Sequence, residues 1–281
     1  MTLRQLLKAA TQTLQQVSES AQFEAELLLA HALQQSRAYL LAHLDDDITP
    51  ENEKRFTHLL QRRSAREPIA YILQQREFWS QSLQVTKDTL IPRPETECLV
   101  EWVLESFPDK KSQLRVADLG TGSGAIAIAL AIERPHWQIT ATDVSQSALD
   151  IASNNAQALA LSNISFHQGN WFTAFPGDAE LFDIMVSNPP YLAETEWLDY
   201  AAGLSYEPRN ALVSGIDGLD AITEIVNTAK DYLKPAGCLF IEHGFRQGES
   251  VRQLFLAADY ASVATRCDLA HLERITSGFK K

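Results

Sequence analysis

The sequence has little cysteine and no long apolar run. Its 3 cysteines, Cys98, Cys238 and Cys267, are scattered, without Cys-x-x-Cys or another metal-ligand spacing. This excludes a disulfide framework and a cysteine-based zinc site, so we expect reduced thiols and no metal. Polar residues interrupt the apolar ones after Met1, and no uninterrupted stretch is long enough to span a bilayer. We therefore expect a cytoplasmic protein without a signal peptide or a membrane partner.

Basic residues are scarce in the larger part of the chain. Residues 1–75 carry 8 Lys and Arg against 9 Asp and Glu, a net charge of −1, whereas residues 76–281 carry 16 against 27, a net charge of −11. Because a protein that grips duplex DNA exposes a basic surface to the phosphates, we expect no nucleic acid at the active site. One basic cluster exists, and we interpret it as a solvated helix face rather than a docking patch. It consists of Lys54, Arg55, Arg62, Arg63 and Arg66.

The hydrophobic pattern divides the chain into regions of different periodicity. Residues 3–66 show helical spacing, with an apolar stripe that we expect to form the core of a small bundle, and Thr49-Pro50 has the pattern of a helix start. Residues around Ser80 to Ser82 have the pattern of a hairpin. We therefore predict a helical domain at 1–75, a β-hairpin linker at 76–90 and a larger domain at 91–281.

The larger domain alternates strands with helices, which predicts an α/β fold. We expect strands at 115–119, 138–142, 164–168, 181–187 and 238–242, followed by two strands with no helix between them. Such alternation is typical of a mostly parallel sheet covered on both faces, here with seven strands and a terminal antiparallel hairpin.

A glycine-rich segment follows the first of these strands. The run Gly120-Thr121-Gly122-Ser123-Gly124 leads into a helix of small residues. Glycines let the backbone approach a ligand, and the free N–H groups of a helix start favour a negative group. Asp143 ends the next strand, 23 residues after Gly120, where an acid usually binds ribose hydroxyls. Because Gly120, Gly122 and Ala125 also fit G-x-G-x-x-G/A, the loop alone leaves a dinucleotide-dependent oxidoreductase open.

Asn188-Pro189-Pro190-Tyr191 follows the strand at 181–187. The prolines fix the backbone, so we expect the Asn188 side-chain oxygen and the Pro189 carbonyl to face outward as two acceptors. A planar NH2 group has two hydrogens to donate to them, and the Tyr191 ring can pack against its flat face. The alternative is a proline-rich turn that merely ends a buried strand.

The two motifs meet if the strand order reverses beside the first strand. The carboxyl ends of the first and fourth strands then flank one crevice, which brings the glycine loop to Asn188. A nucleotide-type cofactor and an NH2-binding turn in one crevice indicate an N-methyltransferase that uses S-adenosylmethionine.

Further segments, together with these motifs, give the chain a resemblance to the release factor glutamine methyltransferase family over nearly its whole length. They are Arg76-Glu77-Phe78-Trp79, Ile91-Pro92-Arg93-Pro94-Glu95-Thr96-Glu97, Tyr206-Glu207-Pro208-Arg209-Asn210-Ala211-Leu212 and the tail from Asp268 to Gly278. The resemblance implies a Rossmann-like class I methyltransferase fold without a metal. It also implies methylation of the glutamine side-chain nitrogen (N5) in the Gly-Gly-Gln tripeptide of class 1 peptide-chain release factors. The helical domain would dock the release factor, and the enzyme would be a monomer.

The resemblance also assigns residues. Gly120, Thr121, Gly122, Ser123 and Gly124 would line the methionine part of the cofactor, Asp143 would bind the ribose, and Asn170 and Trp171 would border the adenine. Asn188, Pro189, Pro190 and Tyr191 would bind the substrate, with Asn188, Pro189 and Tyr191 catalytic and Asn188 also touching the cofactor. The family usually has Asp where this chain has Asn170, a weaker acceptor, and it usually has Gly at Gln74 and His271.

Two other functions remain to be weighed. An adenine N6-methyltransferase acting on DNA or RNA would use Asn188 to Tyr191 on a flipped base, but it should also carry a basic target-recognition region. A non-catalytic cofactor-binding scaffold should have a broken glycine loop or a broken Asn-Pro-Pro-Tyr motif, and both are intact. The sequence therefore favours the protein methyltransferase.

Overall fold

The computed structural model describes residues 1–175, 180–197 and 204–281. They form two compact units, Met1–Gln75 and Arg76–Lys281. Each unit has its own hydrophobic core.

The first unit is helical. Its helices are α1 (Leu3–Leu14), α2 (Ala21–Leu33), α3 (Arg37–Ala42), α4 (Pro50–Ser64) and α5 (Ile69–Leu73). Thr2 accepts from the Gln5 backbone at the start of α1, and Thr49 caps α4 with Pro50 in its first turn, as the sequence predicted. The stripe of α1 is buried through Leu3, Leu6, Ala10 and Leu14.

Most of the basic cluster is paired inside this unit. Arg55, Arg62 and Arg63 form ion pairs with Glu51, Glu67 and Glu24. Arg63 is largely buried and joins α4 to α2, so its charge serves packing within the unit.

A β-hairpin of β1 (Gln75–Phe78) and β2 (Gln81–Gln84) follows, and all of it except Gln75 belongs to the second unit. Trp79 and Ser80 both have positive φ, 50° and 56°, which is the backbone of a two-residue type I′ turn. Phe78 and Leu83 are buried in the core of the unit. After the hairpin come η1 (Pro94–Thr96) and α6 (Glu97–Ser106).

A seven-stranded sheet in the order β5-β4-β3-β6-β7-β9-β8 carries the rest of the unit. Pairs from β5 to β7 are parallel, whereas β7–β9 and β8–β9 are antiparallel, which confirms the predicted terminal hairpin. The order reverses beside β3, which pairs with both β4 and β6 as the sequence analysis supposed. The strands are β3 (Arg115–Leu119), β4 (Gln138–Asp143), β5 (Ile164–Gln168), β6 (Phe182–Ser187), β7 (Leu233–Glu242), β8 (Tyr260–Cys267) and β9 (Glu273–Lys280).

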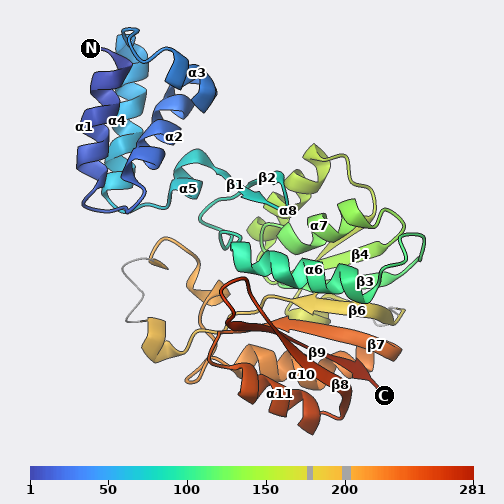
Figure 1. Ribbon diagram of the computed structural model, residues 1–281. Helices are drawn as coiled ribbons and strands as arrows, with labels where there is room; N and C mark the ends of the chain where they lie inside the picture. The colour runs from blue at the N-terminus through green and yellow to red at the C-terminus, as the bar shows by residue number, and fades with distance from the viewer. Residues whose placement is uncertain (176–179, 198–203) are drawn as a thin grey trace. The chain divides into compact units, whose positions relative to one another are not determined.

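Helices cover both faces of the sheet (Figure 1). One core joins α6 and α7 (Ala125–Glu133) to sheet residues such as Val116 and Ile184, and α8 (Gln146–Ala158) adds Ala156 to it. The other joins α10 (Asp220–Tyr232) and α11 (Gly248–Ala257) to Ala117 and Met185. Successive strand residues thus enter opposite cores, which explains the nearly continuous apolar strands of the sequence.

Candidate active site

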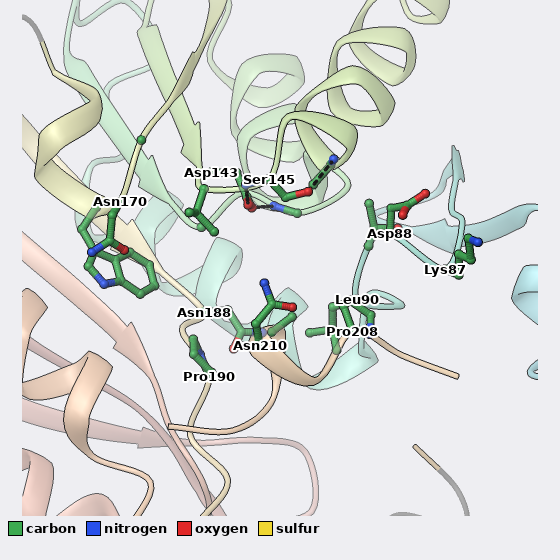
Figure 2. Close-up of a pocket in the computed structure, with 18 residues that line it drawn as sticks. Lys87, Asp88, Leu90, Asp143, Ser145, Asn170, Asn188, Pro190, Pro208 and Asn210 are labelled. Atoms are coloured by element: carbon green, nitrogen blue, oxygen red, sulfur yellow. Dashed lines mark hydrogen bonds between the residues drawn. The ribbon is translucent and has the colours of Figure 1, made fainter. Parts of the chain in front are cut away.

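A cavity of about 440 Å³ lies where β3, β4 and β6 end. Its size is that of a small-molecule site. Figure 2 shows Asp143 and Ser145 on one side, Asn170 on a second, Asn188 and Pro190 on a third, and Lys87, Asp88 and Leu90 on the fourth. The lining residues are Lys87, Asp88, Thr89, Leu90, Gly120, Gly122, Asp143, Val144, Ser145, Ala148, Gly169, Asn170, Trp171, Asn188, Pro190, Pro208, Asn210 and Ala211.

The glycine loop presents bare backbone to this cavity. Gly120, Gly122 and Gly124 have φ of +73°, +56° and +83°, values that side chains disfavour. A Cβ on Gly120 would lie 3.1 Å from the Trp171 ring, whereas a Cβ on Gly122 would meet no described atom within 4 Å. Gly122 therefore lies against the open space that a ligand would occupy.

Asp118 supports the loop from beneath. Its Oδ2 accepts from the Thr121 hydroxyl at 2.6 Å and from the Ala127 backbone at 3.2 Å, which ties the loop to the first turn of α7. Burial raises the pKa of this carboxyl to about 7. Asp118 is not among the predicted site residues, although an acid inside an apolar strand marks it in the sequence.

Asp143 stands at the cavity with its carboxylate fixed. Its Oδ2 accepts from the Gly122 backbone and its Oδ1 from the Ser145 backbone, both at 2.9 Å. Burial raises its pKa, and these backbone bonds oppose the rise. Because a carboxylate oxygen can accept a second bond, both atoms still have acceptor capacity.

The turn after β5 places an aromatic ring in the wall. A Cβ on Gly169 would lie 2.5 Å from the Ala174 backbone nitrogen, so this position has room for glycine alone. Trp171 has a φ of +46°, which is unusual for a bulky residue and is a mark of functional sites. It lines the cavity beside Asn170, whereas Phe172 is buried in the core.

Asn188 follows β6 at the cavity edge. Its Nδ2 donates to Thr96 Oγ1 at 3.1 Å. Its Oδ1 is buried and accepts no hydrogen bond from any residue that the structure describes. A buried polar atom without a partner is rare in folded proteins and therefore indicates a ligand contact.

The structure brings together seven of the residues predicted for the site, namely Gly120, Gly122, Asp143, Asn170, Trp171, Asn188 and Pro190. The other five are not among the residues that line the cavity. They are Thr121, Ser123, Gly124, Pro189 and Tyr191. Thr121, Ser123 and Gly124 instead shape the loop. The Ser123 carbonyl accepts from Asn155, and Gly124 precedes α7.

Tyr191 is not among the lining residues of this cavity, and its hydroxyl lies near the charges of Glu242, Arg274 and Arg93. Its ring packs against the core formed with α10 and α11, and burial raises the pKa of its hydroxyl. Its backbone N–H donates to Leu212 and its carbonyl accepts from Gln247, so the turn after the prolines is held by distant residues.

Two loops that the sequence analysis did not assign to the site complete the wall. One carries Lys87 to Leu90, and the other includes Pro208, Asn210 and Ala211. Glu207 joins them, because its Oε1 accepts from Arg93 at 2.5 Å and its Oε2 from the Ile91 backbone at 3.1 Å. The sequence did mark these loops, because Arg93 and Glu207 belong to two of the segments that carry the family resemblance.

Within residues 1–175, 180–197 and 204–281, no cluster of three or more His, Cys, Asp or Glu side chains is suited to hold a metal ion. Over the same residues, no helix has both the length and the apolarity needed to cross a membrane.

Comparisons with known proteins agree with this geometry. Residues 5–73 match the family model of the PrmC N-terminal domain, and residues 110–269 match that of a methyltransferase domain. The chain is 46% identical to a release factor glutamine methyltransferase of Coxiella burnetii over 98% of both chains. It is 43% identical to the Escherichia coli protein of the same name over 94% of both. A methyltransferase structure from Pyrococcus furiosus has the same fold, with a TM-score of 0.51 at 19% identity over 70% of this chain and 88% of that one.

Proposed function

Because the chain belongs to the release factor glutamine methyltransferase family, we propose that its cavity binds S-adenosylmethionine and that Asn188 presents a release-factor glutamine to it. The product is a glutamine methylated on its side-chain nitrogen. The observation that carries this proposal is the Oδ1 of Asn188, a buried atom with no hydrogen-bond partner in the described part of the chain. Asn188 lies in the wall of the cavity that the glycine loop and Asp143 also line.

The residues around the cavity fit the cofactor. Asp143 has acceptor capacity for the two ribose hydroxyls, and the open side of Gly122 lets the methionine part lie against the backbone. Trp171 offers a flat apolar surface to the adenine, and Asn170 lies next to it. When bound, the cofactor supplies an electrophilic methyl group on a positively charged sulfur.

The substrate amide is a poor nucleophile because its nitrogen lone pair is delocalised into the carbonyl. We propose that Asn188 Oδ1 and the Pro189 carbonyl accept the two N–H groups and so fix the nitrogen in line with the methyl carbon. The same acceptors stabilise the positive charge that develops on nitrogen. Since the N–H acidifies only as the new bond forms, proton loss follows transfer and no early general base is needed.

Tyr191 belongs to this proposal in a changed role. Its ring is partly buried against the core, and its backbone bonds to Leu212 and Gln247 hold the turn that carries Asn188 and Pro189. We therefore propose that Tyr191 positions the acceptors.

We further propose that the helical unit docks the release factor, as the resemblance implies. The assembly is then one enzyme to one substrate protein, acting in the cytoplasm where release factors work. The strongly acidic second unit is consistent with a protein substrate and offers little attraction to phosphates.

The test is methyl transfer from labelled S-adenosylmethionine to a purified class 1 release factor. A release factor with Gly-Gly-Ala in place of Gly-Gly-Gln and a duplex DNA serve as parallel acceptors. Labelling of the Gly-Gly-Gln protein alone supports the proposal. Labelling of the DNA would favour the adenine methyltransferase, and labelling of nothing would favour the scaffold.

A further inference from the structure

Glu242 is a buried carboxylate beside Asn188 that the proposed mechanism leaves unused. It ends β7, which pairs with β6 so that Ser187 lies opposite Ile241 and the next residues are Asn188 and Glu242. Its side chain is 1% exposed, and its Oε2 has no hydrogen-bond partner among the described residues. A buried ionisable group costs stability, so its presence beside a substrate-binding residue requires a reason.

The side chains of Thr96 and Asn188 lie beside the Glu242 carboxylate. Hydrogen bonding from both side chains favours the ionised carboxylate and so lowers the pKa of Glu242 against the effect of burial, and Asn188 Nδ2 donates to Thr96 Oγ1 at 3.1 Å. An ionised carboxylate can only accept, so the Thr96 hydroxyl turns its hydrogen toward Glu242 and its lone pair toward Asn188. Both amide hydrogens of Asn188 are thereby directed inward, which leaves Oδ1 for the substrate.

We propose that Glu242 is a positioning residue that, directly and through Thr96, holds the Asn188 amide with its oxygen available to the substrate NH2 group. This inference rests on the proposed function, in which Asn188 Oδ1 accepts a hydrogen bond from the substrate NH2 group. The two ends of an asparagine amide have nearly the same shape and differ in hydrogen bonding alone. Without the acidic partner the amide can turn over, and its nitrogen would then face the donor groups of the substrate.

The surroundings of Glu242 make this device sensitive to pH. Arg274 of β9 favours the ionised form, but its guanidinium also pairs with Asp268 at 2.8 Å, and Glu95 of η1 opposes ionisation. The buried Tyr191 hydroxyl adds a neutral neighbour. Burial outweighs these effects and raises the pKa of Glu242 to about 7. Ionisation of Glu242, and with it the orientation of Asn188, therefore develops as the pH rises through neutrality.

The test measures kcat and KM for a release factor from about pH 6 to about pH 8.5 in four variants and the wild type. Glu242→Gln removes the charge, Thr96→Val removes the hydroxyl and Thr96→Ser keeps it. Asp183→Asn is the matched control, because Asp183 is a carboxylate near the opposite end of β6, where it pairs with Lys234. Binding of S-adenosylmethionine to each variant is measured by calorimetry.

We expect kcat of Glu242→Gln to fall about 10- to 100-fold at high pH, the effect of losing a charge-assisted hydrogen bond. The variant should also lack the rise of kcat with pH through neutrality that we expect of the wild type. The affinity for S-adenosylmethionine should be unchanged, since neither Glu242 nor Thr96 is among the residues that line the cavity. Thr96→Val should lose activity, whereas Thr96→Ser and Asp183→Asn should follow the wild-type pH profile.

The outcomes separate the two proposals. A wild type that methylates no release factor overturns the proposed function. An active wild type together with an equally active Glu242→Gln of unchanged pH profile overturns the role of Glu242 alone. If Glu242→Gln fails to fold or to bind cofactor, the Thr96 pair decides, and equal kcat in Thr96→Val and Thr96→Ser overturns the role.

Discussion

Replacing Asp118 with asparagine should change how the stability of the protein depends on pH. The Asp118 carboxyl is fully buried beneath the glycine loop, and burial raises its pKa from 3.8 to about 7. Between these two values the folded state holds the proton more tightly than the unfolded state, so a rising pH favours unfolding. Ionisation of Asp118 therefore leaves the free energy of unfolding unchanged below about pH 4 and lowers it progressively as the pH rises to about 7.

The size of the effect follows from the shift. Each pH unit is worth about 1.36 kcal/mol, so Asp118 should lower the free energy of unfolding by about 4 kcal/mol across this window. The asparagine of the Asp118→Asn variant has no charge to form and removes this dependence. Its side-chain oxygen can still accept from Thr121 and Ala127, and any fixed cost of its buried NH2 group is the same at every pH.

The assay is urea unfolding of the wild type and Asp118→Asn at a series of pH values from about 4.5 to about 8. The difference in unfolding free energy between the two proteins should move in favour of the variant as the pH rises. A difference that stays constant over this range would show that Asp118 ionises with an ordinary pKa, and the argument from burial would be wrong.

Three further substitutions test the site. Asn188→Ala removes the free acceptor and should lower kcat about 100-fold, the usual effect of deleting one preorganised transition-state contact; an unchanged kcat in steady-state assays would contradict the assignment. Gly122→Ala places a methyl group in the open side of the cavity and should weaken S-adenosylmethionine binding about tenfold by calorimetry; wild-type affinity would show that the cofactor lies elsewhere. Glu207→Ala leaves Arg93 and the Ile91 backbone without their acceptor and should cost about 2 kcal/mol in urea unfolding; an unshifted midpoint would mean that this ion pair does not hold the two loops.

The sheet and the meeting of the two motifs were predictable from local patterns. Alternating apolar strands and helices fix the parallel connections, and the reversal beside β3 brings the loop at Gly120 to Asn188. Asp143 was predictable for the same reason, because it ends the strand next to β3.

The side-chain network around Asn188 was not predictable, because it depends on residues far apart in the sequence. Thr96 and Asn188 are 92 residues apart, and Glu242 reaches them from another strand. The backbone after the prolines is held in the same way, since the Tyr191 N–H donates to the Leu212 carbonyl. Spacing within a motif carries no information on such contacts.

The chemical position of the transferred methyl group decides whether this enzyme methylates a glutamine side chain. A release factor labelled by this enzyme is digested, the labelled peptide is identified by mass spectrometry, and the peptide is hydrolysed in acid. A methyl group on the glutamine side-chain nitrogen must leave as labelled methylamine, and the labelled peptide should contain Gly-Gly-Gln. Label released as methanol, or label on a peptide without that glutamine, would contradict the account.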